Sequence, residues 1–206
     1  MKAAFFSAIA LAMSAFAAPV FDAHNAARDV EVAKRAGIST PQGLITTLQG
    51  AVSSVKTHSG SFDNILDKVQ SGDISKEEGS NQALPELNSL LDTLTSLVRE
   101  LTGAAGLDVT DADVKTVQTL AIALVIEVTT IVKGLITILG VRAQLDSVLH
   151  SVFQILAKVL ILVIGLVAAI VPGLVGALSP LLVGLGSGLV APLLTLVAGL
   201  LAGLAA

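Results

Sequence analysis

The sequence predicts an all-α protein: an amphipathic helical bundle, then a long apolar helical hairpin, then hydrophobic helices broken by proline and glycine. Three observations predict this class. Apolar residues recur at helical spacing between residues 36 and 113, helix-capping residues stand between these stretches, and residues 114–206 are apolar over helical lengths. We expect four regions along the chain: 1–17, 18–35, 36–113 and 114–206.

Residues 1–17 have the pattern of a secretory signal peptide. A mostly apolar run ends in Ala15-Phe16-Ala17, which fits the small-x-small rule, so we expect cleavage after Ala17. The alternative is a short membrane anchor, but about 15 apolar residues are too few to span a bilayer. Residues 18–35 are an expected pro-segment that ends in the dibasic pair Lys34 and Arg35. A processing protease would cut after this pair; a chance pair in a linker is the alternative.

The region 36–113 is polar, with eleven acidic and four basic residues. Ser39-Thr40-Pro41 predicts a helix start, because proline suits the first helical turn. A shorter apolar segment containing Phe62 follows and closes at Gly72. The first apolar stripe consists of Leu44, Ile45, Leu48, Val52 and Val55.

Two capping patterns mark the next helix starts. Ser75 with Glu78 has the pattern of a capping box, and Thr110 with Asp113 is a second one with Asp in place of Glu. The helix after Ser75 should end at Gly103 and be kinked or restarted at Pro85. We interpret the apolar stripes as the core-facing sides of a bundle; partner-binding faces are the alternative.

The region 114–206 begins with two nearly apolar stretches, 115–140 and 141–171, which predict a hairpin about Gly140. A charge buried in apolar surroundings needs a partner. We therefore expect two ion pairs across the hairpin, Glu127 with Lys158 and Lys133 with Asp146.

After Lys158, none of the remaining 48 residues is charged. The run 159–178 would be about 30 Å long as a helix, which matches the hydrocarbon thickness of a bilayer. Pro172, Pro180 and Pro192 divide the tail into helical pieces. Small-xxx-small spacing of glycines in this region predicts close helix association. The alternative is that a glycine-biased composition produces such spacings by chance. The glycines concerned are Gly165, Gly173, Gly184, Gly188, Gly199 and Gly203.

The composition excludes several classes of protein. The chain has no cysteine, which removes disulfide frameworks and thiolate metal sites, and its net charge of −4 disfavours a nucleic-acid binder. The histidines are far apart and no catalytic or phosphate-binding pattern occurs, so we expect no enzyme activity, metal or cofactor. With 53% hydrophobic and 14% charged residues, a freely soluble monomer is not expected.

A signal peptide, the Lys34-Arg35 site, an acidic helical half and a cysteine-free half rich in Leu, Val, Gly and Ala together resemble small secreted proteins of filamentous fungi. One such family is the basidiomycete cell-wall proteins that partly substitute for hydrophobins. The stretch 40–139 is similar in rhythm to fungal hydrophobic-surface-binding proteins. The resemblance rests on architecture and composition, so it carries over no functional residue. Hydrophobins themselves are excluded, because they need eight cysteines.

We therefore expect a secreted, non-enzymatic amphiphile of the cell surface or cell wall. Its acidic half would stay hydrated, and its tail from about Val159 would bind a hydrophobic surface, lipid or other copies of the chain, in a homo-oligomer or larger assembly. Two alternatives stay open. One is an integral membrane protein with a luminal or extracellular helical domain and two to four apolar spans; the other is a membrane-active pore former.

Overall fold

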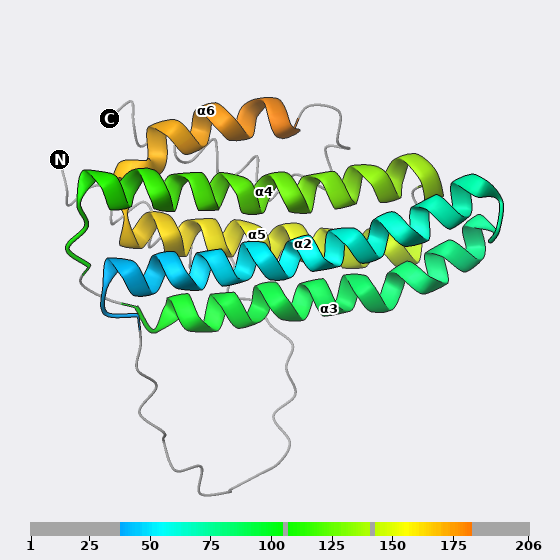
Figure 1. Cartoon of the computed structure of the whole chain (residues 1–206), viewed down its shortest axis with the longest axis horizontal. Coiled ribbons are helices and arrows are strands. Elements are labelled where there is room, and N and C mark those ends of the chain that lie inside the picture. Colours follow the sequence, from blue (N-terminus) through cyan, green and yellow to red (C-terminus); the bar gives the residue numbers. More distant parts are fainter. Residues whose placement is uncertain (1–37, 105–106, 141–142, 183–206) are drawn as a thin grey trace, which may run out of the picture.

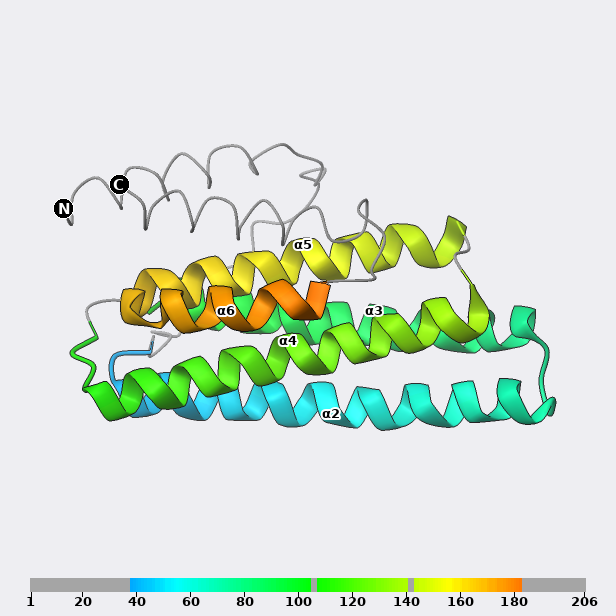
Figure 2. The same cartoon turned by 90° about the horizontal axis from the view of Figure 1, so that it is seen from above.

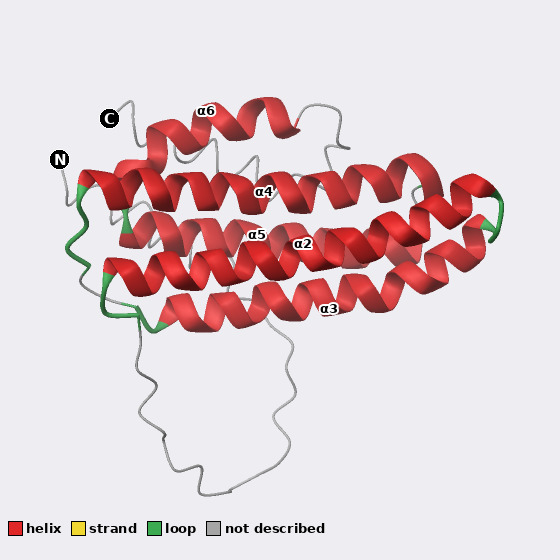
Figure 3. Cartoon of the chain, viewed as in Figure 1, coloured by secondary structure: helices red, strands yellow, loops and turns green. Residues whose placement is uncertain are grey.

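The computed structural model describes residues 38–104, 107–140 and 143–182, and every structural statement below concerns these residues. They are almost entirely helical and contain no strand (Figure 3), which confirms the predicted all-α class. The long helices are α2 (Pro41–Ser71), α3 (Lys76–Thr102), α4 (Asp111–Leu139) and α5 (Ala143–Leu166). A 3₁₀ turn, η1 (Ala168–Ile170), leads into the shorter helix α6 (Val171–Leu182).

The predicted helix starts are confirmed, and each is stabilised by a local hydrogen bond. The Thr40 side chain accepts from the Gly43 N–H at 3.1 Å, and Ser75 accepts from the Glu78 N–H at 3.1 Å. At the start of α4 the capping box is complete. The Thr110 hydroxyl accepts from the Asp113 N–H at 3.3 Å, and the Asp113 carboxylate accepts from the Thr110 N–H at 3.0 Å.

Glycines end two of the helices in backbone conformations that other residues adopt with strain. Gly72 follows α2 with φ of 82°, and Gly140 follows α4 with φ of 83°. Both were expected as breaks, as was Gly103, which follows α3.

Three expected interruptions are absent. The helix α2 is continuous from Pro41 through Phe62, and α3 is continuous through Pro85. Pro85 removes one backbone hydrogen bond, but it lies on the exposed side of α3. Burial of Ala83 and Leu87 on either side of it favours one uninterrupted helix. Helix α6 likewise continues past Pro180, where a break was expected, to Leu182.

The four long helices form a bundle in which successive helices run in opposite directions (Figure 1). The most extensive contacts join α2 to α4, α3 to α5 and α2 to α3. The first two of these are pairs of parallel helices. The chain reaches this arrangement because the connection from α3 to α4 crosses to the far side of α2, instead of placing α4 beside α3.

The side of the bundle between α4 and α5 is built differently. These two helices make few direct contacts, and η1 touches both of them while α6 packs on α4 (Figure 2). Three side chains of η1 and α6, here called the plug, are almost completely buried at this side: Ile170, Val171 and Leu174. Next to them, the backbone of Gly173 lies so close to the Gln118 side chain that a Cβ atom would overlap it.

One core joins the acidic and the apolar regions of the sequence. Its largest fully buried side chains come from α2 to α5 and include Phe62 and Phe153. The predicted arrangement, a bundle followed by a separate apolar hairpin, therefore differs from the structure: α4 and α5 each pack lengthwise on a helix of the acidic region. In aqueous solution the apolar stripes of α2 and α3 are shielded from water only when they pack against other apolar helices. Helices α4 and α5 provide these apolar faces.

Candidate functional site

Several predicted site residues lie outside the described residues. These are the processing residues Ala17, Lys34 and Arg35 and the tail glycines Gly184, Gly188, Gly199 and Gly203. The other two glycines lie in different environments. Gly165 is exposed, with nothing within 4 Å of an added Cβ, whereas Gly173 is in close contact with α4.

The two predicted ion pairs do not form among the described residues. The Glu127 carboxylate lies 3.9 Å from the Lys56 ammonium group of α2, because α4 packs along α2. Lys158 and Asp146 are both exposed on α5, so water solvates their charges. The Glu127 side chain is 23% exposed and Lys56 is 61% exposed, so this pair is a surface contact of small energetic value.

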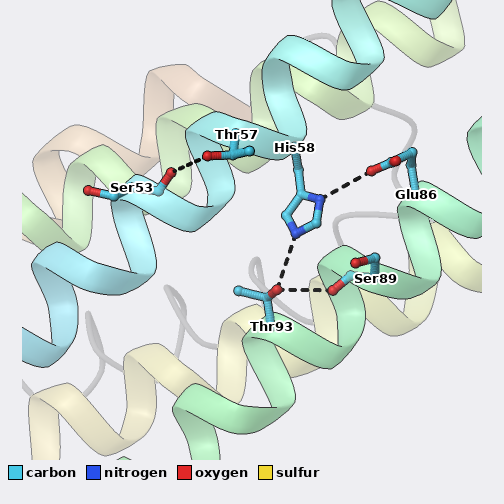
Figure 4. Close-up of polar contacts among 6 residues, drawn as sticks. All are labelled: Ser53, Thr57, His58, Glu86, Ser89 and Thr93. Carbon is cyan, nitrogen blue, oxygen red and sulfur yellow. Dashed lines mark hydrogen bonds and ion pairs between the residues drawn. The ribbon is translucent and has the colours of Figure 1, made fainter.

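A cluster of polar side chains joins α2 to α3 (Figure 4). The His58 ring lies between the two helices, with Nδ1 3.3 Å from a Glu86 carboxylate oxygen and Nε2 3.2 Å from the Thr93 hydroxyl. The Thr93 hydroxyl donates its proton to the Ser89 carbonyl at 3.0 Å, so towards His58 it can only accept. Both ring contacts are hydrogen bonds at once when both ring nitrogens carry a proton. The His58 side chain is only 14% exposed.

The order hydroxyl, imidazole, carboxylate is also that of a nucleophilic triad, but the geometry does not suit that chemistry. A nucleophilic hydroxyl donates its proton to the histidine, whereas Thr93 donates to the backbone of its own helix. Thr93 also lies inside α3, where backbone N–H groups are used by the helix and cannot stabilise an oxyanion. The arrangement suits a polar link between two helices.

Beside this cluster, an open groove of about 460 Å³ runs between α2 and α3. Its lining includes the small residues Gly50 and Ala51, several hydroxyl side chains, and the carboxylates of Asp92 and Glu100. None of the described residues that line it is cationic or aromatic. It can accept and donate hydrogen bonds, but nothing in it selects one ligand class. No group of three metal-ligating side chains occurs among residues 38–104, 107–140 and 143–182.

Charge is distributed unevenly over the helices. All four long helices carry charged side chains, and α3 carries the most. The described residues after Lys158, which include η1 and α6, have none, and Ile126 of α4 is 41% exposed. The helical segments Asp111–Leu139 and Gln144–Leu166 are long and apolar enough to cross a membrane, although 44% and 50% of their most apolar windows are buried inside the bundle.

The partners that His58 and Glu127 have in the structure were not predicted from the sequence. His58 and Glu86 stand at equal distances along the chain from Gly72, so counting outward from that turn would have paired them. No comparable signal links Lys56 to Glu127, because their helices are parallel and α3 separates them in the sequence.

Comparison with known proteins identifies no relative: no family model, no curated protein and no solved structure matches this chain.

Proposed function

We propose that this chain is a secreted, non-enzymatic amphiphile of the cell surface or cell wall, which binds or assembles at hydrophobic interfaces. The observation that carries the proposal is the distribution of charge along the chain. Helices α2 and α3 expose charged side chains and α3 is acidic, while residues 159–206 contain no charged residue. A chain of this kind can hold one side in water and place the other against an apolar phase.

The bundle itself supports this assignment over a catalytic one. Its described polar cluster links helices, and the Thr93 hydroxyl of that cluster donates to the backbone of its own helix instead of to His58. Burial of α4 and α5 against α2 and α3 gives the apolar helices a water-compatible state before they reach an interface.

The proposal is tested by adsorption of the purified chain to hydrophobic beads, with the variant Leu189→Glu/Leu196→Glu as the perturbation. Two charges in the uncharged tail should weaken adsorption by about tenfold or more, because a charge is expensive to move out of water. The matched control is Gln49→Glu/Ser96→Glu, which adds the same two charges at exposed positions of α2 and α3. Equal adsorption by all three proteins, or none by the wild type, would refute the proposal.

The second candidate is an integral membrane protein with a luminal or extracellular helical domain and two to four apolar spans. The two apolar helical segments favour it, since each has the length of a span. Its requirement for detergent separates it from the first candidate. An integral protein aggregates when detergent is removed, whereas a secreted bundle sediments in plain buffer as a monomer or a defined oligomer with the same helical content.

A further inference from the structure

We infer that the chain binds a hydrophobic interface through the side of the bundle between α4 and α5, which opens when the plug residues Ile170, Val171 and Leu174 leave it. The inference rests on the proposed function and adds the surface that performs it. The occupant of the opened side is an apolar surface or liquid phase.

Opening is needed because the closed bundle offers little apolar surface. Among the large hydrophobic side chains of the described residues, Ile126 is the most exposed, at 41%. The plug residues and their neighbours in the core are at most a few per cent exposed. Adsorption that uses these residues therefore requires that helices separate.

The contacts between helices show where separation is easiest. The pairs α2 with α4, α3 with α5, and α2 with α3 are in extensive contact, whereas α4 and α5 touch little and are joined through η1. The polar links follow the same division. His58 with Glu86 and Thr93 joins α2 to α3, and Lys56 with Glu127 joins α2 to α4. Within the part of the chain that the structure describes, no hydrogen bond or ion pair joins α4 to α5 or to α6.

The connections of the chain set the direction of opening. The end of α4 and the start of α5 lie at one end of the bundle and are only a few residues apart in the chain, and the plug lies towards the other end (Figures 1 and 2). The two parallel pairs can therefore move apart as a wedge, with the α2–α3 contact as the hinge. Helix α6 is uncharged and continues into the uncharged tail, so partition of the tail into an apolar phase would draw the plug out.

The test measures two distances before and after adsorption. Because the chain has no cysteine, spin labels can be attached at introduced cysteine pairs without background. The pair Thr119→Cys/Lys158→Cys reports on α4 against α5, and the control pair Gln49→Cys/Ser96→Cys reports on the α2–α3 hinge; all four positions are exposed. On hydrophobic nanoparticles the first distance should lengthen by about 10 Å or more, the diameter of a helix, while the second stays within a few ångströms.

Adsorption with both distances unchanged would overturn the inference and leave the proposed function intact, since the tail alone would then bind. Lengthening of both distances would overturn it as well, because the bundle would be unfolding as a whole. Failure to adsorb contradicts the proposed function and this inference with it.

A second measurement compares two cavity variants. Leu174→Ala removes a plug side chain, and Leu90→Ala removes an equally buried side chain from α3. Adsorption should be at least about tenfold faster for the plug variant, because a buried Leu→Ala substitution strongly destabilises the site it occupies. Equal acceleration by the two variants would contradict release of the plug as the controlling step.

Discussion

The apolar helix α4 has an inner and an outer face, and two neighbouring positions distinguish a water-folded bundle from a membrane span. Leu124 is fully buried and belongs to the common core, whereas Ile126 is 41% exposed on the outer side. We predict that Leu124→Ala destabilises the bundle strongly in detergent-free buffer and that Ile126→Ala does not.

The magnitudes follow from burial. Truncation of a fully buried leucine removes its transfer free energy and leaves a cavity, so Leu124→Ala should lower the free energy of unfolding by about 3 kcal/mol. With a urea m-value of about 2 kcal/mol/M for a bundle of this size, the midpoint falls by about 1.5 M. Ile126→Ala removes a side chain that is already partly in water, and alanine favours the helix. This variant should therefore lower the free energy of unfolding by less than about 1 kcal/mol.

The assay is urea unfolding followed by far-ultraviolet circular dichroism. Equal losses for the two variants would refute the reasoning, because they would mean that α4 has no distinct inner face in water. A transition that is cooperative only in detergent would refute it too, since the core would then depend on a lipid-like environment.

Three further perturbations test other contacts of the bundle. The hydrogen bond from the Thr110 hydroxyl, with that from the Thr110 backbone N–H, holds the pKa of Asp113 below its ordinary value of 3.8. The ionised Asp113 therefore stabilises the folded bundle above that value, and this stabilisation is lost as the pH falls through the folded-state pKa. The Tm difference between wild type and Asp113→Ala should shrink between about pH 5 and pH 2. A Tm difference that stays constant over this range would count against the cap. An added Cβ at Gly79 would lie 2.5 Å from a side-chain carbon of α2, so Gly79→Ala should cost about 1–3 kcal/mol in urea unfolding. Gly60→Ala should instead raise the free energy of unfolding by about 0.5–1 kcal/mol, since that site is open. If the two substitutions changed the free energy of unfolding in the same direction, the close packing at Gly79 would be contradicted. The Thr129 hydroxyl is buried without a hydrogen-bond partner, so Thr129→Val should raise the free energy of unfolding by about 1 kcal/mol, whereas a loss would indicate a partner for the hydroxyl.

The helix boundaries were predictable because their causes are local. Thr40, Ser75 and Thr110 each hydrogen-bond a backbone N–H within one turn, and Gly72 and Gly140 supply the conformations that end a helix. Such features are written in four or five consecutive residues.

The pairing of helices was not predictable, because it depends on which apolar faces meet across long stretches of chain. The sequence indicates equally well that α4 packs on α5 or on α2, since all three carry apolar stripes. The choice of α2 decides that Glu127 contacts Lys56 and leaves Lys158 in water. Pro85 shows the same limit, because packing on both sides of it outweighs a local preference to break the helix.

The central claim is that the apolar helices α4 and α5 belong to a bundle that leaves the cell folded in water, and fractionation of cells tests it most directly. The full chain carries an internal tag at the exposed turn that follows Gly72, and the membranes are extracted with alkaline carbonate. The account predicts that the protein is found in the medium or the wall, or is released from membranes by carbonate. Recovery in the carbonate-resistant pellet would contradict it, because α4 and α5 would then cross the bilayer.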